Sequence, residues 1–292
     1  MGNAVQASSK AQLDRDQLQC VQGRIGFARR TPNEDAPAAD TPDGFELPMV
    51  SYDVTIRNAR PVVNDLSLDR EGFTVVKHKS SSLNERDPEI MAQNYLDEMV
   101  PFIKDHFNAS WVNTVDVGGV AIRSLEDNAA PRAWGGKSQR TVKNFSAGNA
   151  HIDYSPVACP RVAARDAQLQ GIEIRPYSRL MIIQAWRTFS EPPQDFPLAF
   201  CDASSIVPGD LIEAYQNKYG AKIQTWFLHH NPAQRWYYLP DMTADEFFLF
   251  KGYDSNAHYD PRSAHSAFDN RRALPNAKPR KSIEARFYVY YD

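Results

Sequence analysis

The feature that most constrains the fold is a succession of strand-like segments that runs from residue 178 to the end of the chain. The segments are rich in β-branched and aromatic residues, which favour strands, and turn residues separate them. In order, they are SRLMIIQAWRTF, FPLAFCDASSI, KIQTWFLHHN, QRWYYLPDM, DEFFLFKGYDS, AHSAFDN and SIEARFYVYYD. Residues 209–221 differ from them and predict a short helix that Gly220 ends. About eight strands with little helix among them predict a mainly β fold with flanking helices, either a double-sheet jelly roll or a barrel.

The N-terminal part of the chain divides into an arm and an extension of the β domain. Residues 1–48 are rich in polar residues and lack an apolar period, which predicts a flexible N-terminal arm. Residues 49–292 then form a single jelly-roll domain with an N-terminal α/β extension, because mainly β domains of this size are common. Within the extension, residues 87–107 predict a helix that packs on the outside of a sheet. Asp87 is its expected N-cap, and Pro101 is expected to kink or split it.

Charge and cysteine content exclude several classes of protein. The formal net charge is −3, so the chain lacks the basic excess that is typical of nucleic-acid binding. It contains no apolar run long enough to span a membrane, and its N-terminus lacks the apolar core of a signal peptide. The three cysteines have neither disulfide nor zinc-site spacing. We therefore expect a cytoplasmic protein, and the sequence leaves open whether it forms a homodimer.

The motif with the clearest chemistry is His151-Ile152-Asp153. On a strand, residues two positions apart point to the same face, so this imidazole and this carboxylate lie side by side. Two such ligands and a second histidine from elsewhere form the facial triad that holds non-haem Fe(II) and leaves coordination positions open. The motif therefore predicts a metal site that includes His151 and Asp153.

The third ligand must come from the remaining histidines. A second His-x-Asp, His258-Tyr259-Asp260, competes with the first, but only His265 follows it, too close for intervening strands. His258 also lies in turn-like sequence, whereas His265 opens the apolar segment HSAF. The first pair leaves room for about five or six strands before His265, as a jelly roll requires. We therefore predict His151, Asp153 and His265 as the ligands.

A basic group follows His265 on the last strand. Arg280 and Ser282 lie two positions apart, and a guanidinium beside a hydroxyl suits a carboxylate. This pattern predicts that Arg280 and Ser282 hold an anionic cosubstrate, with Arg286 on the same face as the competitor for this role. Residues 126–148 form a long irregular segment before the first motif. With Trp134 and two following glycines, this segment is either a hinged lid or an ordinary surface loop.

A series of short motifs, strongest in the second half of the chain, has the order and spacing of a known family. The matching positions are Trp186-Arg187, Pro197-Leu198-Ala199, Cys201-Asp202, Trp236-Tyr237-Tyr238, Pro240, Met242, Glu246, Phe250-Lys251, Tyr253-Asp254-Ser255, His265-Ser266-Ala267-Phe268, Arg280, Ser282-Ile283-Glu284 and Arg286. With these residues the chain resembles the asaB-type hydroxylase/desaturase family of fungal secondary metabolism, which includes gibberellin desaturase-like proteins. The resemblance extends over residues 50–292.

The resemblance implies a cupin-like double-stranded β-helix and Fe(II)/2-oxoglutarate-dependent oxygenase chemistry. It carries the metal-ligand positions onto His151, Asp153 and His265, and it adds Gln184 as a polar residue for the cosubstrate pocket. Arg187 is either a second pocket residue or a member of a structural ion pair. In residues 117–123 the sequence departs from the family pattern, because a histidine is missing and two glycines have entered. This departure leaves substrate contacts from that segment unassigned.

The implied reaction is the oxidation of a small-molecule biosynthetic intermediate by hydroxylation, desaturation or oxidative formation of a ring or peroxide. Fe(II), 2-oxoglutarate and O₂ are the expected cofactors, with ascorbate as an optional reductant. Trp134, Trp186, Phe250 and Tyr253 are candidates for the pocket wall. Two alternatives remain: a catalytically inactive jelly-roll binding or partner subunit, and a metal-dependent cupin-like enzyme that does not use 2-oxoglutarate. The sequence names no substrate.

Overall fold

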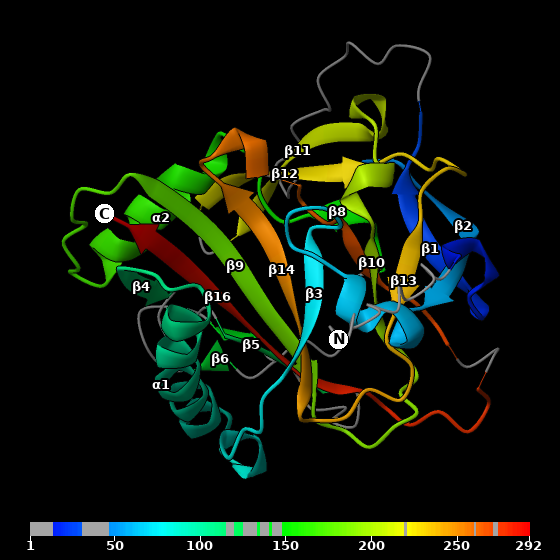
Figure 1. Cartoon of the computed structure of the whole chain (residues 1–292), viewed down its shortest axis with the longest axis horizontal. Helices are drawn as coiled ribbons and strands as arrows, with labels where there is room; N and C mark the ends of the chain where they lie inside the picture. Colours follow the sequence, from blue (N-terminus) through cyan, green and yellow to red (C-terminus); the bar gives the residue numbers. More distant parts are fainter. Residues whose placement is uncertain are drawn as a thin grey trace, which may run out of the picture.

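The computed structural model describes residues 14–30, 47–114, 120–124, 133–134, 140–141, 148–218, 221–259, 261–270 and 274–292. Within these ranges two large β-sheets make up most of the structure, and two α-helices flank the six-stranded sheet at one side of the molecule (Figure 1). The chain therefore has the mainly β architecture with flanking helices that its strand-rich sequence predicts.

The strand order of each sheet brings distant parts of the sequence together. The eight-stranded sheet consists, in order, of β1 (Cys20–Ala28), β2 (Met49–Asn58), β13 (Trp236–Tyr238), β10 (Leu198–Cys201), β15 (His265–Ala267), β8 (His151–Ile152), β12 (Ala221–Leu228) and β11 (Leu211–Lys218). The six-stranded sheet consists of β3 (Phe73–Lys77), β14 (Glu246–Asp254), β9 (Arg179–Thr188), β16 (Lys281–Tyr291) and β4 (Trp111–Thr114), with β5 (Ala121–Ser124) also paired to β16. The short strands β6 (Ala133–Trp134) and β7 (Arg140–Thr141) pair with each other.

Aromatic side chains fill the space between the two sheets. Phe200 of β10 packs against Phe248 and Phe250 of β14, with ring centroids 4.4 and 5.0 Å apart. Phe73 of β3 stacks on the Phe200 ring, with the two ring centroids 5.2 Å apart. Because β10 belongs to one sheet and β3 and β14 to the other, these contacts hold the sheets face to face as in a jelly roll.

Helix α1 (Pro88–His106) agrees with the predicted helix. The Asp87 side chain accepts hydrogen bonds from the backbone N–H groups of Glu89 and Ile90, and so satisfies donors that a helix N-terminus leaves free. Pro101 lies inside the helix, which continues to His106. The expected split at Pro101 is therefore wrong: the proline lacks only its own backbone N–H donor.

Arg187 of β9 connects α1 to the six-stranded sheet. Its buried guanidinium donates to Tyr95 Oη of α1 at 3.2 Å and to the carbonyl oxygens of His78 and Ala244 at 2.9 and 3.2 Å. The Phe247 ring covers the guanidinium at 4.6 Å. Arg187 therefore has a structural role on the face of the sheet that α1 covers, but its partners among the described residues are neutral oxygens and an aromatic ring and not the acid of the predicted ion pair.

The predicted N-terminal arm needs a correction at residues 20–28. These residues form β1, which pairs with β2 along its whole length, from Cys20 opposite Arg57 to Ala28 opposite Met49. Ile25 and Phe27 are fully buried, so their side chains attach β1 to the core. Residues 1–13 and 31–46 of the predicted arm lie outside the described residues.

The predicted short helix at residues 209–221 is wrong. This segment contains β11, which pairs with β12 from Leu211 opposite Leu228 to Lys218 opposite Ala221. The Glu213 side chain also accepts a hydrogen bond from Trp226 Nε1 of β12 at 3.1 Å. Pairing with a neighbouring strand outweighs a weak local preference for helix.

Helix α2 (Ala158–Leu169) was not predicted, and it begins five residues after Asp153. Its Cys159 and Val162 pack in one cluster with Ile182 of β9 and Tyr288 of β16. Tyr288 Oη also donates a hydrogen bond to the Asp166 carboxylate of α2. The helix therefore fixes the chain that leaves the predicted metal site.

Replacing Arg187 with alanine should lower the free energy of unfolding by about 3 kcal/mol, because Tyr95 Oη and two buried carbonyl oxygens lose their donor. Urea unfolding followed by circular dichroism measures the loss. The matched control is Arg24→Ala, since Arg24 lies on the surface beside Asp53 and should contribute less than about 0.5 kcal/mol. Equal losses in the two variants would contradict the structural role of Arg187.

Candidate active site

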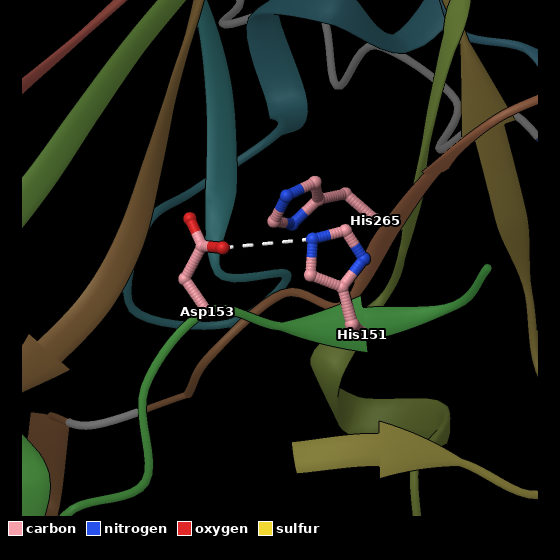
Figure 2. A group of neighbouring side chains, drawn as sticks. All are labelled: His151, Asp153 and His265. Atoms are coloured by element: carbon pink, nitrogen blue, oxygen red, sulfur yellow. Dashed lines mark ion pairs between the residues drawn. The ribbon is translucent and has the colours of Figure 1, made fainter. Parts of the chain in front are cut away.

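Two neighbouring strands bring the three predicted ligands together (Figure 2). His151 of β8 and His265 of β15 are directly paired across the two antiparallel strands. Asp153 follows β8, two positions after His151, and its side chain points toward the two imidazoles. One ligand atom from each residue lies within 4.8 Å of the others. The eight-stranded sheet therefore gathers two imidazoles and one carboxylate at a single place.

His151 is oriented by a hydrogen bond to the backbone. Its Nδ1 lies 2.8 Å from the carbonyl oxygen of Asn149. A carbonyl oxygen only accepts hydrogen bonds, so Nδ1 carries the proton and Nε2 keeps its lone pair. Nε2 lies 3.5 Å from Oδ1 of Asp153. In this tautomer His151 presents Nε2 to the space that the three side chains share.

His265 is buried among aromatic rings and is only 5% exposed. The ring centroids of Phe250 and His151 lie 4.9 and 4.4 Å from its own. Burial, and then the neighbouring His151, lower the pKa of His265 to about 3. Its Nδ1 is buried, and the described part of the chain offers this atom no hydrogen-bond partner. A neutral imidazole with an unsatisfied nitrogen fits a metal ligand.

The Asp153 carboxylate is held by two residues of the opposite sheet. Its Oδ2 accepts a hydrogen bond from Gln184 Nε2 of β9 at 2.6 Å and one from Arg286 Nη2 of β16 at 2.9 Å. Its Oδ1 faces His151. Gln184 and Arg286, both predicted as cosubstrate residues, therefore contact the carboxylate that completes the triad.

Glu284 is a further member of this network, and the prediction did not assign it a role. Arg286 Nη2 donates to Glu284 Oε1 at 2.8 Å. Burial is the largest influence and would raise the pKa of the Glu284 carboxyl, but Arg286, Arg123 and His265 together outweigh it, so this pKa lies below its usual value. The available signal was its position on β16, where Ser282, Glu284 and Arg286 alternate on one face.

Gly252 leaves room for Gln184. A Cβ atom on Gly252 would lie 2.9 Å from Oε1 of Gln184, too close for an ordinary contact. The pairing of β14 with β9 also shifts register between Lys251 and Tyr253, on either side of this glycine. The bulge and the missing side chain thus allow Gln184 to reach Asp153.

Arg280, immediately before β16, is 1% exposed and lies in a different environment from Arg286. Its Nη1 donates to the carbonyl oxygen of Phe196 at 2.6 Å, and its guanidinium lies 5.5 Å from the centre of the Trp186 ring. Burial, and then the neighbouring Arg123, lower the pKa of Arg280 to about 9. Its Nε is buried without a partner among the described residues. Arg280 is therefore a buried cation that the nearby Asp195 and Glu284 carboxylates stabilise only in part, and one of its donors still lacks an acceptor.

The predicted pocket aromatics lie in different places. Trp186 lies against Arg280, and Phe250 lies against His265, so both line the interior near the predicted site. Tyr253 instead packs in the cluster that includes α2. For Tyr253, core packing is therefore the better description.

Two sequence features lie away from the assembled site or outside the described residues. His258, of the competing His258-Tyr259-Asp260 motif, is exposed in a 3₁₀ turn, and Asp260 lies outside the described residues. The side chain of Trp134 and most of residues 126–148 also lie outside them, so the predicted lid stays a prediction.

Fold and site together define a class of protein. Two imidazoles and one carboxylate converge on a jelly roll, which is the donor set and geometry of the facial triad of non-haem Fe(II) oxygenases. The unsatisfied Nδ1 of His265 and the doubly held Oδ2 of Asp153 both suit a metal ion among the three side chains.

The chain belongs to the family described as YDMC, oxidoreductase/YMDC permease-like domain, which matches residues 27–290. The Fe(II)/2-oxoglutarate-dependent dioxygenase nvfI of Aspergillus novofumigatus is 28% identical over 244 residues, which cover 82% of this chain and 83% of that protein. The hydroxylase/desaturase asaB of Aspergillus flavus is 31% identical over 130 residues, or 39% of this chain and 57% of that protein. These relatives confirm the resemblance to asaB-type hydroxylases and desaturases.

A solved structure supports the fold. The iron and alpha-ketoglutarate-dependent endoperoxidase NvfI superposes with a TM-score of 0.73 at 25% identity, and the match covers 93% of this chain and 98% of NvfI. The predicted jelly roll is thereby confirmed. In the described part of the present chain, no helix combines the length and the apolar character needed to cross a bilayer.

In the metal-free protein, the His265 imidazole should stay neutral from about pH 7 down to about pH 4. An ordinary histidine becomes charged within this range, because its pKa is about 6.5. Burial lowers its pKa to about 3, so protonation requires stronger acid. NMR of protein with isotope-labelled histidine measures the chemical shift of the His265 ring as the pH is lowered. The His265 resonance is identified as the one that is missing from the His265→Gln variant. The same protein in urea is the control, since its histidines should titrate near about 6.5. A His265 resonance that titrates there in the folded state would contradict the description.

Proposed function

We propose that this protein is an Fe(II)/2-oxoglutarate-dependent oxygenase that oxidises a small-molecule intermediate of fungal secondary metabolism. The observation that carries the proposal is the convergence of His151, Asp153 and His265, whose ligand atoms lie within 4.8 Å of one another. In this proposal the three residues are the ligands of Fe(II). The names of the relatives, a dioxygenase and a hydroxylase/desaturase, support the same chemistry.

Gln184 and Arg286 act on the metal through Asp153. Their hydrogen bonds hold Oδ2 of Asp153, so Oδ1 is directed at the space beside His151. Partners of this kind orient a ligand and raise its affinity for the metal. We therefore assign both residues to positioning Asp153, in place of the cosubstrate contact predicted from the sequence.

Arg280 is our choice for binding the cosubstrate. Arg286 already pairs with Asp153 and Glu284, whereas the Arg280 guanidinium donates to the Phe196 carbonyl oxygen and lies against the Trp186 ring, with no ion pair among the described residues. A buried guanidinium is stabilised by a carboxylate that it can bind with two N–H groups. Ser282, on the same face of the last strand, supplies the neighbouring hydroxyl.

When bound, Fe(II) together with 2-oxoglutarate and O₂ supplies the oxidising power, with succinate and CO₂ as co-products and ascorbate as a reductant. The residues of the chain bind, orient and exclude water. The rings of Phe200 and Phe250 shield His265 from solvent, with centroids 6.0 and 4.9 Å from its own. Hydroxylation, desaturation and peroxide formation all begin from this arrangement, and the substrate's position decides between them.

The two alternatives are less consistent with the site. A catalytically inactive subunit would tolerate the loss of a ligand or of the buried arginine, and this chain retains both. A cupin-like enzyme without 2-oxoglutarate would have no use for a buried cation beside the triad. We also propose a cytoplasmic location, because Cys20, Cys159 and Cys201 are all free thiols.

Anaerobic addition of Fe(II) and 2-oxoglutarate should produce the visible charge-transfer band of the iron–oxoacid chelate. The His265→Ala variant should lose this band, because one of three protein ligands is missing. Absorbance titration measures both results. His258→Ala is the matched control, since it removes an exposed histidine of the competing motif. A band of unchanged strength in His265→Ala would exclude the assigned centre.

Arg280→Gln should raise the Kd of 2-oxoglutarate by about tenfold to a hundredfold, because a buried charge-assisted contact is lost. Arg286→Gln should instead weaken metal binding by about tenfold to a hundredfold, because Asp153 loses one of its two partners. Calorimetric titrations with Co(II), and then with 2-oxoglutarate, separate the two effects. The opposite pattern would show that Arg286 holds the cosubstrate.

A further inference from the structure

Arg123 is a second arginine near Arg280, and none of the functions described so far uses it. It lies in β5, directly opposite Ser282 of β16. Paired residues of adjacent antiparallel strands share a face of the sheet, so Arg123 projects to the same side as Ser282. Arg280 precedes Ser282 by two positions and is fully buried. The two guanidinium groups are therefore diagonal neighbours, with Ser282 beside both.

Neither guanidinium has an anionic partner in the described part of the chain. The Nε atoms of Arg123 and Arg280 are both buried without a hydrogen-bond partner there. Arg280 has the carbonyl oxygen of Phe196 and the face of the Trp186 ring, neither of which is charged. Buried donors without a partner are rare in folded proteins and indicate a missing ligand, ion or water. The Asp195 and Glu284 carboxylates lie close enough to raise the pKa of Arg280, but neither accepts a hydrogen bond from its guanidinium among the described residues. Two neighbouring guanidinium groups with unpaired donors make a ligand of negative charge the best candidate.

The acidic side chains in this region are already bound elsewhere. Glu284 lies next along the same face of β16, but Arg286 holds its carboxylate at 2.8 Å. Asp195 accepts a hydrogen bond from the backbone N–H of Arg280 at 3.0 Å. Within the described ranges, neither carboxylate forms an ion pair with the Arg123 or Arg280 guanidinium. Among the described residues, therefore, no carboxylate binds the two guanidinium groups, and an anionic ligand would supply the missing acceptor.

We propose that Arg123 and Arg280 together form a two-arginine site, with the Ser282 hydroxyl beside it, for the carboxylate that lies far from the metal in a bound dicarboxylate. The inference rests on the proposed function, in which 2-oxoglutarate is that dicarboxylate. Two guanidinium groups around one carboxylate satisfy both unpaired Nε donors and remove the repulsion between the cations. Arg123 thereby becomes a determinant of cosubstrate binding in the segment that departs from the family pattern.

The test compares Arg123→Gln with the unmodified protein, both loaded with Co(II) under anaerobic conditions. Calorimetry measures the Kd of 2-oxoglutarate and of 2-oxovalerate, which has the same carbon chain but a methyl group in place of the distal carboxylate. We expect the Kd of 2-oxoglutarate to rise by about tenfold or more, because a charge-assisted contact is lost, and the Kd of 2-oxovalerate to stay unchanged.

Three controls make the result specific. Arg24→Gln removes a surface arginine and should change neither Kd. Arg123→Lys keeps the positive charge but loses the planar guanidinium with its paired N–H donors. Its Kd for 2-oxoglutarate should lie between the values of the unmodified protein and of Arg123→Gln. The Kd of Co(II) should be equal in all variants, which shows that the metal site and the fold are intact.

The outcomes separate this inference from the proposed function. If the unmodified protein binds 2-oxoglutarate and both Arg123 variants bind it equally tightly, the inference is overturned and the function stands; the anion is then one on the oxidised substrate. If Arg123→Gln weakens both oxoacids alike, the inference is also overturned, because the distal carboxylate is not what Arg123 recognises. If the unmodified protein binds neither oxoacid with metal present, the proposed function fails as well.

Discussion

The contact on which the site depends is the ion pair between Asp153 and Arg286, because it joins the two sheets at the metal centre. Asp153 leaves the eight-stranded sheet, and Arg286 projects from the six-stranded sheet. A buried ion pair stabilises a protein only when its remaining hydrogen-bonding groups are also satisfied. Gln184 gives Oδ2 of Asp153 a second donor, and Glu284 gives Nη2 of Arg286 a second acceptor. The packing of the jelly roll and the orientation of the carboxylate are therefore set by the same four side chains.

Three buried arginines show that partners, more than burial, distinguish the roles of similar residues. Arg187 binds a hydroxyl and carbonyl oxygens, which hold a helix to the sheet. Arg286 binds two carboxylates of the chain itself, which orient the metal site. Arg280 has no carboxylate partner among the described residues, and this makes it the arginine suited to an external anion. Sequence position alone could not separate Arg280 from Arg286, because both lie on one face of the last strand.

Features that depend on local chemistry were predictable from the sequence, whereas features that depend on distant partners were not. The i, i+2 spacing of His151 and Asp153 and the cap at Asp87 follow from the backbone alone, and the structure has both arrangements. By contrast, β11 forms because β12 lies beside it, and β1 forms because β2 does. Helix α2 did carry a start signal that the prediction did not use: Ser155 and Pro156 precede it, and Oγ of Ser155 accepts a hydrogen bond from the backbone N–H of Ala158 at 3.3 Å. The role of Gln184 required the position of the opposite sheet, which no short motif contains.

The direct pairing of His151 with His265 has a consequence for folding. These residues lie far apart in the sequence, and between them the chain must form α2 and the strands β9 to β14. Contacts of such long range form slowly, because the intervening chain must first be ordered. Strand β8 has only two residues, so it offers little pairing of its own to hold an early intermediate. The triad should therefore be among the last parts of the molecule to assemble, and a newly made chain would acquire its metal only after both sheets have closed.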